Sequence, residues 1–326
     1  MSDSAPMRLL SSDDVDALAT SPVGLAAAAD SARLAGGSGL TTGRVQVNGD
    51  IAWMRIMAGL VDDLDLLGYK EFHRVGQRVR YHVHLFRQST GDALGTVDGR
   101  RITGLRTAST AAVAVRHWAQ GRPVRLGLVG SGEEAKEGLR ALSGAVTLAG
   151  AVVWSPTVAN REAFAETMSA ETGIEVTAVA DMQQVMDASD VAYVATSSHH
   201  EPFLGADQLG QVGLVAAIGS TMPVHRELRG DVFVKAAQVV VDTPDATHES
   251  GDCIEAAGLG WNPADAVLLA DYVNLAPIAA AGGTTLFKSI GSVEQDLVLA
   301  YHLLMEAERT GAGTVIDDVS SLRIMR

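Results

Sequence analysis

The sequence predicts an α/β fold in which a doubly wound parallel sheet follows an antiparallel sheet. From Val124 onward, short apolar runs alternate with helical stretches, a pattern typical of buried parallel strands. Before that point the apolar residues alternate with polar ones between turn residues, as in half-buried antiparallel strands. A glycine-rich segment also separates the first of the later strands from the helix after it, as in folds that bind ligands at strand ends.

A helix and an antiparallel sheet are expected in the first third of the chain. The polar segment Ser11–Asp14 precedes an apolar-periodic run, which is typical of a capped helix start. Residues 44–58 alternate around the pair Asn48-Gly49, a strong hairpin signal. Residues 79–98 predict two more strands joined by a polar turn at Ser89–Asp92.

The pattern changes near residue 103, where an Ala-rich segment predicts a long helix that ends at Gly121 and leads into a second domain. A helix is also expected from Ser292 to Arg309. Between these helices the predicted strands lie at 124–130, 151–156, 175–180, 191–196, 213–219 and 238–243, with a further candidate at 271–275.

Composition narrows the classes of function. The 326 residues carry a net charge of −14, which disfavours binding to nucleic acid or to an anionic membrane. Cys253 is the sole cysteine, so no intramolecular disulfide is expected, as in a reducing compartment. With neither an apolar leader nor a membrane-length apolar run, a cytoplasmic location is expected. No metal site is predicted, because the adjacent His199 and His200 are more typical of a solvated loop.

The most specific local motif is Gly130-Ser131-Gly132-Glu133-Glu134-Ala135, which follows a predicted strand and opens a predicted helix. This is the G-x-G-x-x-A form of the Rossmann dinucleotide fingerprint. Gly130 allows a tight turn, Gly132 lets the backbone approach a pyrophosphate, and Ala135 lets the helix pack close to the strand. The helix N-terminus then offers N–H groups and a positive dipole end to phosphates. The alternative is a glycine-rich turn of another α/β protein.

The end of the second strand of this part of the chain carries no carboxylate. An Asp or Glu there would bind the ribose 2′-hydroxyl of NAD. Ser155 and Thr157 stand there instead, followed by Arg161, and hydroxyls with a guanidinium suit the 2′-phosphate of NADP. The sequence therefore favours NADP(H), with NAD(H) as the alternative. In that alternative Arg161 faces solvent on the first turn of the next helix.

Seven longer segments together resemble the ornithine cyclodeaminase/mu-crystallin family over about residues 40–315. The resemblance implies a homodimer with an α+β dimerisation and substrate domain, residues 1–118 with 302–326, formed by both chain ends. The Rossmann domain is then residues 119–301. The segments are LGYKEFH, DGRRITGLRTASTAA, LGLVGSGEEA, DVAYVATSSHHEPFL, IGSTMPVHREL, VVVDTPDATHESGD and TLFKSIGSVEQDL.

The resemblance also implies the site residues. Arg44 and Arg106 match the arginines that hold the substrate carboxylate, and Lys70 matches the active-site lysine. Members of the family include cyclodeaminases, amino-acid dehydrogenases and ketimine or imine reductases, which use a nicotinamide cofactor on amino-acid-like substrates. Glu133 is expected to contribute only its backbone. The expected cofactor contacts are Thr107, Gly130, Ser131, Gly132, Glu133, Ser155, Thr157, Arg161, Thr196, Gly219 and Ser289.

One position departs from the cyclodeaminases. Their segment after the fifth Rossmann strand reads G-x-D-x-P, whereas this chain has Thr221 in place of the Asp. A hydroxyl cannot act as a carboxylate base near neutral pH, and ketimine reductases similar to mu-crystallin also carry a hydroxyl residue there. Thr221, which is expected at the substrate, therefore disfavours cyclisation with release of ammonia.

These residues predict an NAD(P)H-dependent imine or ketimine reductase, or the equivalent amino-acid dehydrogenase. Arg44 and Arg106 would hold the substrate carboxylate. Lys70, expected to be partly buried among cationic groups, would have a lowered pKa and act as general acid or base. An amino-acid cyclodeaminase and a non-enzymatic, crystallin-like NADP(H)-binding protein are the alternatives. The simpler interpretations are a surface Arg44, a solvated Arg106 and a strand-edge Lys70.

Other polar residues allow two interpretations each. His82 and His84 share a strand face and either line a substrate pocket or form a buried hydrogen-bonded pair. Lys288-Ser289 is expected in a loop before the last helix, where it contacts the nicotinamide or caps the helix. Glu294 and Asp296 are expected on the solvated face of that helix.

Overall fold

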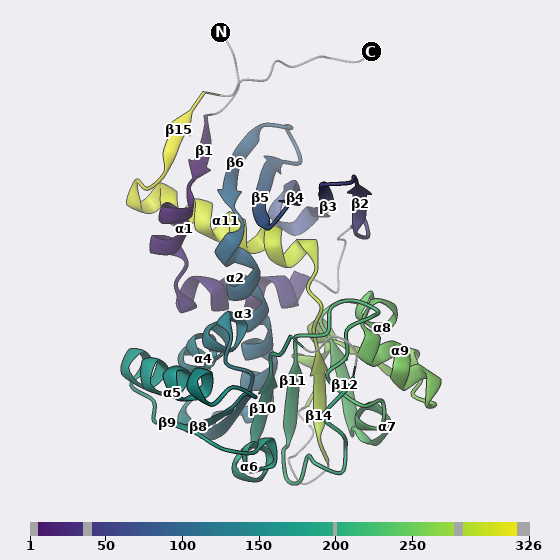
Figure 1. Ribbon diagram of the computed structural model, residues 1–326. Coiled ribbons are helices and arrows are strands. Elements are labelled where there is room, and N and C mark those ends of the chain that lie inside the picture. Colours follow the sequence, from purple (N-terminus) through teal and green to yellow (C-terminus); the bar gives the residue numbers. More distant parts are fainter. Residues whose placement is uncertain (1–5, 35–40, 198–200, 277–282, 318–326) are drawn as a thin grey trace. The chain divides into compact units, whose positions relative to one another are not determined.

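The computed structural model describes residues 6–34, 41–197, 201–276 and 283–317 (Figure 1). The chain divides into two compact units. The first comprises Met1–Val23, Gly37–Thr103 and Val293–Arg326, and the second comprises Gly24–Gly36 and Gly104–Ser292.

A seven-stranded sheet of order β15-β1-β6-β5-β4-β3-β2 forms the first unit. Neighbouring strands are antiparallel except β1 and β6, which are parallel. β1 pairs with β15, so segments near both chain ends lie in this unit. The strands are β1 (Met7–Leu10), β2 (Val45–Asn48), β3 (Ala52–Val61), β4 (Leu66–Val75), β5 (Arg78–Arg87), β6 (Ala93–Asp98) and β15 (Thr314–Ile316).

The local signals of the first unit form as the sequence predicts. Ser11 caps helix α1 (Ser12–Leu18) in a reciprocal capping box with Asp14. β2 and β3 form the hairpin around Asn48-Gly49, and β5 and β6 flank the predicted polar turn. Helix α11 (Val293–Thr310) packs on β3, β4, β5 and β6 through an apolar face that includes Leu297 and Leu304.

The second unit contains an eight-stranded parallel sheet of order β13-β12-β14-β11-β10-β7-β8-β9. From β7 the chain builds β8 and β9 on one side and then returns to build β10 and β11 on the other side. This is the predicted doubly wound arrangement, with its switch point between β7 and β10. The strands are β7 (Val124–Val129), β8 (Leu148–Trp154), β9 (Val176–Ala178), β10 (Val191–Val194), β11 (Leu214–Ala217), β12 (Gln238–Val241), β13 (Val267–Leu268) and β14 (Thr285–Lys288).

Helices cover both faces of this sheet, each over its own apolar cluster. Leu128 and Tyr193 belong to one cluster, whereas their neighbours Val129 and Val194 belong to the other, as alternation along a strand requires. None of the helices in the described residues is long and apolar enough to cross a membrane. The helices are α2 (Ser21–Leu34), α3 (Arg100–Ala119), α4 (Glu133–Ala145), α5 (Val158–Thr172), α6 (Met182–Ala188), α7 (Asp231–Lys235), α8 (Ala246–Glu249), α9 (Gly251–Gly258) and α10 (Leu269–Tyr272).

The unit boundaries differ from the predicted domain limits in three places. Residues 104–118 of α3 belong to the second unit, because Ala108, Ala111 and Ala112 are buried in its core. Residues 24–34 of α2 belong there too, through Ala28 and Ala32. Residues 293–301 of α11 belong to the first unit, because this helix packs on the antiparallel sheet.

Two local predictions in the second unit are wrong. The candidate strand at 271–275 is the end of α10 and a turn, where Tyr272 packs edge-on against His117. Lys288 is the last residue of the buried strand β14 and does not lie in a loop. A short apolar run such as 271–275 does not distinguish strand from helix by periodicity, which explains the first error. The second arises because β14 has only four residues and ends in a lysine, so the sequence shows no clear strand pattern there.

His82 and His84 are half-buried in the first sheet, and each is bonded to a different residue. His82 Nδ1 lies 2.6 Å from Glu71 Oε1, and His84 Nδ1 lies 3.1 Å from Thr96 Oγ1. Their rings are 6.2 Å apart, so they form no hydrogen-bonded pair. His73 Nδ1 lies 3.0 Å from Glu71 Oε2, and Glu71 therefore contacts two imidazoles.

Glu71→Gln should lower stability by about 1 kcal/mol at pH 7, since the change weakens two charge-assisted hydrogen bonds. Burial raises the pKa of Glu71, but the bonds from His73 and His82 outweigh burial and hold that pKa below its usual value. The ionised carboxylate thus stabilises the fold at neutral pH, and its contribution is lost as the pH falls through the lowered pKa. The unfolding temperatures of variant and wild type should therefore converge in acid. An equal difference between the two temperatures at pH 7 and in acid contradicts this assignment.

Candidate cofactor and substrate site

The turn between β7 and α4 has a geometry that only glycine permits at its first position. Gly130 has φ +115°, and a Cβ there would lie 2.1 Å from the carbonyl oxygen of Ala195, just after β10. Ala135 is fully buried behind the turn. A Cβ at Gly132, by contrast, would have no heavy atom within 4 Å. The backbone is thus packed tightly at the switch point and open at Gly132.

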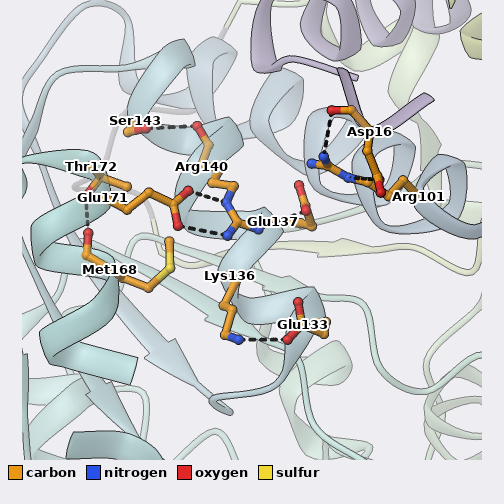
Figure 2. Close-up of polar contacts among 10 residues, drawn as sticks. All are labelled: Asp16, Arg101, Glu133, Lys136, Glu137, Arg140, Ser143, Met168, Glu171 and Thr172. Atoms are coloured by element: carbon orange, nitrogen blue, oxygen red, sulfur yellow. Dashed lines mark hydrogen bonds and ion pairs between the residues drawn. The ribbon is translucent and has the colours of Figure 1, made fainter. Parts of the chain in front are cut away.

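The N-terminus of α4 is suited to an anion. Gly132 is its N-cap residue and has no side chain with which to cap the helix. Two carboxylates lie in the first turn, but the Glu133 side chain is 79% exposed and its Oε1 lies 2.7 Å from Lys136 Nζ (Figure 2). Figure 2 also shows Arg140 bonded to Glu171, which ties α4 to α5. Arg140 binds Glu137 of its own helix as well. The Glu133 carboxylate is therefore partly neutralised on the surface, and its backbone-only role at a cofactor stays a prediction.

Four of the predicted cofactor contacts lie at or beside the end of β8. Ser131 Oγ donates to Ser155 Oγ over 2.9 Å, which joins the glycine turn to the β8 end. Arg161 Nη1 donates to the Ser155 carbonyl oxygen over 2.8 Å, so its guanidinium folds back toward the same strand end. Thr157 is the exposed N-cap residue of α5. This strand end therefore presents hydroxyl and guanidinium groups.

The ends of β10 and β11 are both bound to one buried carboxylate, Glu227. Thr196 donates its backbone N–H and its hydroxyl to Glu227 Oε1 over 2.8 and 2.7 Å. Gly219 and Ser220 donate backbone N–H groups to Oε2 over 2.8 and 3.0 Å. Thr221 follows directly and is half-buried. The sequence does not predict Glu227, because a Glu in the polar segment HREL is usually solvated.

The segment after β14 is fixed by Asp242 and lies against Arg106. Ser289 Oγ donates to Asp242 Oδ2 over 2.7 Å, and the N–H groups of residues 290 and 291 bind the same carboxylate. Gly291 has φ +80°, and a Cβ there would lie 2.1 Å from Arg106 Nη1. The guanidinium of Arg106 therefore packs on the Gly291 backbone, with the buried Thr107 beside it in α3.

Lys70 lies in the interior of the first sheet and not at its edge. β4 is flanked by β3 and β5, and Lys70 is 3% exposed. Its Nζ donates to Thr103 Oγ1 over 2.8 Å and to Asp296 Oδ1 over 2.9 Å. The structure thus places a carboxylate beside Lys70, where the sequence predicted cationic neighbours.

Asp296 is buried, contrary to the predicted solvated position, and is 1% exposed. A signal for this was present, because Asp296 has the same helical phase as Val293, Ala300 and Leu303, which are buried. A carboxylate on an apolar helix face needs a partner, and Lys70 provides it.

Arg44 and Lys70 belong to the first unit, whereas Arg106 belongs to the second. Arg44 is half-buried just before β2. A common substrate site for these three cations stays a prediction. In the described residues no group of three or more His, Cys, Asp or Glu side chains is arranged to hold a metal ion, and His199 and His200 lie outside those residues.

The model of the ornithine cyclodeaminase/mu-crystallin family matches residues 68–308, well over half of the chain. The chain belongs to this family. Two similar proteins are named as reductases. The Delta(1)-pyrroline-2-carboxylate reductase of Bacillus thuringiensis subsp. konkukian is 26% identical over 278 residues, covering 80% of this chain and 84% of that protein. The ketimine reductase mu-crystallin of Rattus norvegicus is 30% identical over 220 residues, covering 67% and 66%.

Solved structures of similar proteins have the same fold as this chain. The Thermococcus litoralis Delta(1)-pyrroline-2-carboxylate reductase in complex with NADH and L-proline has a TM-score of 0.85 and 24% identity, covering 94% of this chain and 99% of that one. The iminosuccinate reductase of Paracoccus denitrificans in complex with NAD+ has a TM-score of 0.87 and 22% identity, covering 96% and 99%. These likenesses confirm the predicted fold class.

Proposed function

We propose that this chain is an NAD(P)H-dependent oxidoreductase acting on the C=N or CH–NH bond of an imino or amino acid. The glycine turn at the switch point of the sheet carries the proposal, because it leaves an uncapped helix N-terminus open at Gly132. The relatives named as pyrroline-2-carboxylate and ketimine reductases support the choice of bond. Small cyclic or linear imino acids are the proposed substrates.

In this proposal the chain binds and orients the substrate and donates the proton that its nitrogen needs. A bound nicotinamide supplies or accepts the hydride. Arg44 and Arg106 hold the substrate carboxylate, because a planar guanidinium can bind both of its oxygens. Reduction of C=N to CH–NH needs one hydride on carbon and one proton on nitrogen. Lys70 is the proposed proton donor, and its bonds to Asp296 and Thr103 fix the position of the ammonium.

A substrate panel tests the proposal. Cyclic and linear imino acids are mixed with NADPH or NADH, and oxidation of the reduced nicotinamide is followed by absorbance at about 340 nm. We expect oxidation that depends on an imine bearing an α-carboxylate. Ammonia released from ornithine or lysine without net nucleotide oxidation indicates a cyclodeaminase instead, which Thr221 disfavours. Tight cofactor binding without turnover on any imine indicates a binding protein.

We also propose that the cofactor is NADP(H) in preference to NAD(H). The hydroxyl groups of Ser155 and Thr157 and the guanidinium of Arg161 stand at the strand end where a 2′-phosphate would lie, and no carboxylate follows β8 before α5. Such a phosphate would be held by charge-assisted hydrogen bonds.

Arg161→Ala should weaken NADPH binding about 10- to 100-fold, as expected for loss of one or two bonds to a charged group. NADH binding should change less than about twofold, so NADH serves as the internal control for damage to the fold. Titration of bound-nucleotide fluorescence measures both affinities. Equal weakening of the two nucleotides would remove Arg161 from the 2′-phosphate site.

A homodimer is proposed as well, and a cytoplasmic location, with which the single buried cysteine agrees. Support for the dimer comes from one face of the first sheet, where Met54, Ile56 and Leu67 are 37–42% exposed. Sedimentation velocity should give twice the 34.0 kDa chain mass. Leu67→Asp should shift the mass toward one chain; a wild-type monomer at micromolar concentration contradicts the proposal.

A further inference from the structure

We propose that Glu227 is a positioning residue for the reaction, which holds the loops after β10 and β11 in the geometry that turnover requires. The inference rests on the proposed function, because these loops carry Thr196, Gly219 and Thr221, which are proposed to contact cofactor and substrate. Glu227 itself touches none of the reacting groups in this proposal. It acts through the backbone that it binds.

The Glu227 carboxylate is fully buried, and each of its oxygens accepts two hydrogen bonds. Oε1 binds the N–H and hydroxyl of Thr196, and Oε2 binds the N–H groups of Gly219 and Ser220. A protonated acid would turn an O–H toward a donor, so this arrangement fits the ionised carboxylate. A Cβ at Gly219 would lie 2.4 Å from Oε1, so glycine allows the close approach.

Glu227 is in turn held by a buried ion pair. Its backbone N–H donates to Asp252 Oδ1 over 2.8 Å, and Asp252 Oδ2 lies 3.1 Å from Lys288 Nζ. Asp252 and Lys288 are both 0% exposed, and Lys288 is the residue before Ser289. The chain of contacts Glu227–Asp252–Lys288 thus links the ends of β10, β11 and β14. All three strand ends carry proposed cofactor or substrate contacts.

A purely structural role explains this arrangement less well. Burial raises the pKa of Glu227, and the attraction of Lys288 offsets that effect only in part, so the ionised group is costly to keep in the core. Well-packed apolar residues are often as stable as buried charges or more so. The four donors lie where ligands bind in such folds, at the carboxyl ends of adjacent strands. Shifts of about 1 Å in such groups can lower rates about 100-fold.

The variant Glu227→Gln tests this role, since it keeps the shape but turns an amide NH₂ toward two of the donors. We expect kcat on the imine to fall about 10- to 100-fold, in line with a misplaced site. The Kd for 2′,5′-ADP, which reports on the adenosine half of the site alone, should stay within about twofold. The fluorescence of bound NADPH should change, because its nicotinamide environment depends on these loops. Glu227→Asp, which keeps the charge, should recover part of kcat.

Glu255→Gln is the matched control. Glu255 accepts from Arg226 Nη1 over 3.0 Å and from the Gly230 N–H over 3.3 Å, farther along the segment after β11. It accepts none of the hydrogen bonds that Thr196, Gly219 and Ser220 donate to Glu227, so kcat of this variant should stay near the wild-type value. Unchanged kcat in Glu227→Gln overturns the inference, and so does a loss of 2′,5′-ADP binding that parallels the loss of kcat. If the Gln variant does not fold, the same readouts are applied to Glu227→Asp, where unchanged kcat and nicotinamide fluorescence overturn it. If the wild-type protein oxidises no nucleotide with any imine, that result overturns the proposed function instead.

Discussion

Lys70→Met should lower turnover at least about 100-fold, the usual loss when a positioned proton donor is removed. The same change should destabilise the protein by about 3–5 kcal/mol, because it removes the ammonium that binds the buried carboxylate of Asp296. Cofactor affinity should remain near the wild-type value in the folded fraction, since Lys70 is proposed to act on the substrate and not to bind the nucleotide. Denaturant titration and steady-state kinetics measure the two effects separately.

A double variant separates chemistry from folding. In Lys70→Met with Asp296→Leu the buried charges are both replaced by apolar side chains, which should return most of the lost stability. Turnover should stay low, because the proton donor is still absent. Recovery of turnover together with stability would show that Lys70 serves the fold alone.

Substitution by alanine should have opposite effects on the stability of the unliganded fold at Gly130 and at Gly132. Gly130→Ala should destabilise the second unit by several kcal/mol or prevent folding, because its φ is +115° and the new Cβ would lie 2.1 Å from a carbonyl oxygen. Gly132→Ala should leave the unliganded fold intact, because φ is −82° and no atom lies within 4 Å of the added methyl group.

Cofactor binding distinguishes the role of Gly132. The methyl group of Gly132→Ala would stand where a pyrophosphate approaches the backbone, so we expect at least about a tenfold rise in Kd for the nucleotide, a cost of roughly 1.4 kcal/mol. Thermal unfolding without nucleotide, followed by nucleotide titration, provides the comparison. Unchanged nucleotide affinity in a folded Gly132→Ala would contradict a pyrophosphate at this turn.

The glycine turn could be predicted because its determinants are local. A strand, two glycines, a small residue and a helix occur within about fifteen residues, and each has a direct steric reason. The hairpin at Asn48-Gly49 and the cap at Ser11 are equally local. The doubly wound sheet follows from the regular alternation of apolar runs. The run at 271–275 is misassigned, and the short strands β13 and β14 are missed.

The residues that the sequence does not reveal depend on contacts between distant segments. Lys70 and Asp296 are 226 positions apart, and helical phase shows only that Asp296 faces a core, not which cation it meets. Glu227 binds groups 31 and 8 positions away and resembles an ordinary surface glutamate in the sequence. Buried charges of this kind are set by tertiary structure, so local patterns do not identify their partners.

Transfer of deuterium tests the central claim most directly. The enzyme is given a cyclic imino acid with NADPH deuterated at the transferring C4 position of the nicotinamide, and the amino-acid product is analysed by mass spectrometry and NMR. Hydride transfer to the imine carbon predicts a product that carries one deuterium at its α-carbon. An amino-acid product without deuterium would contradict the redox assignment. So would the absence of product with every imino acid while the labelled nucleotide stays bound and reduced.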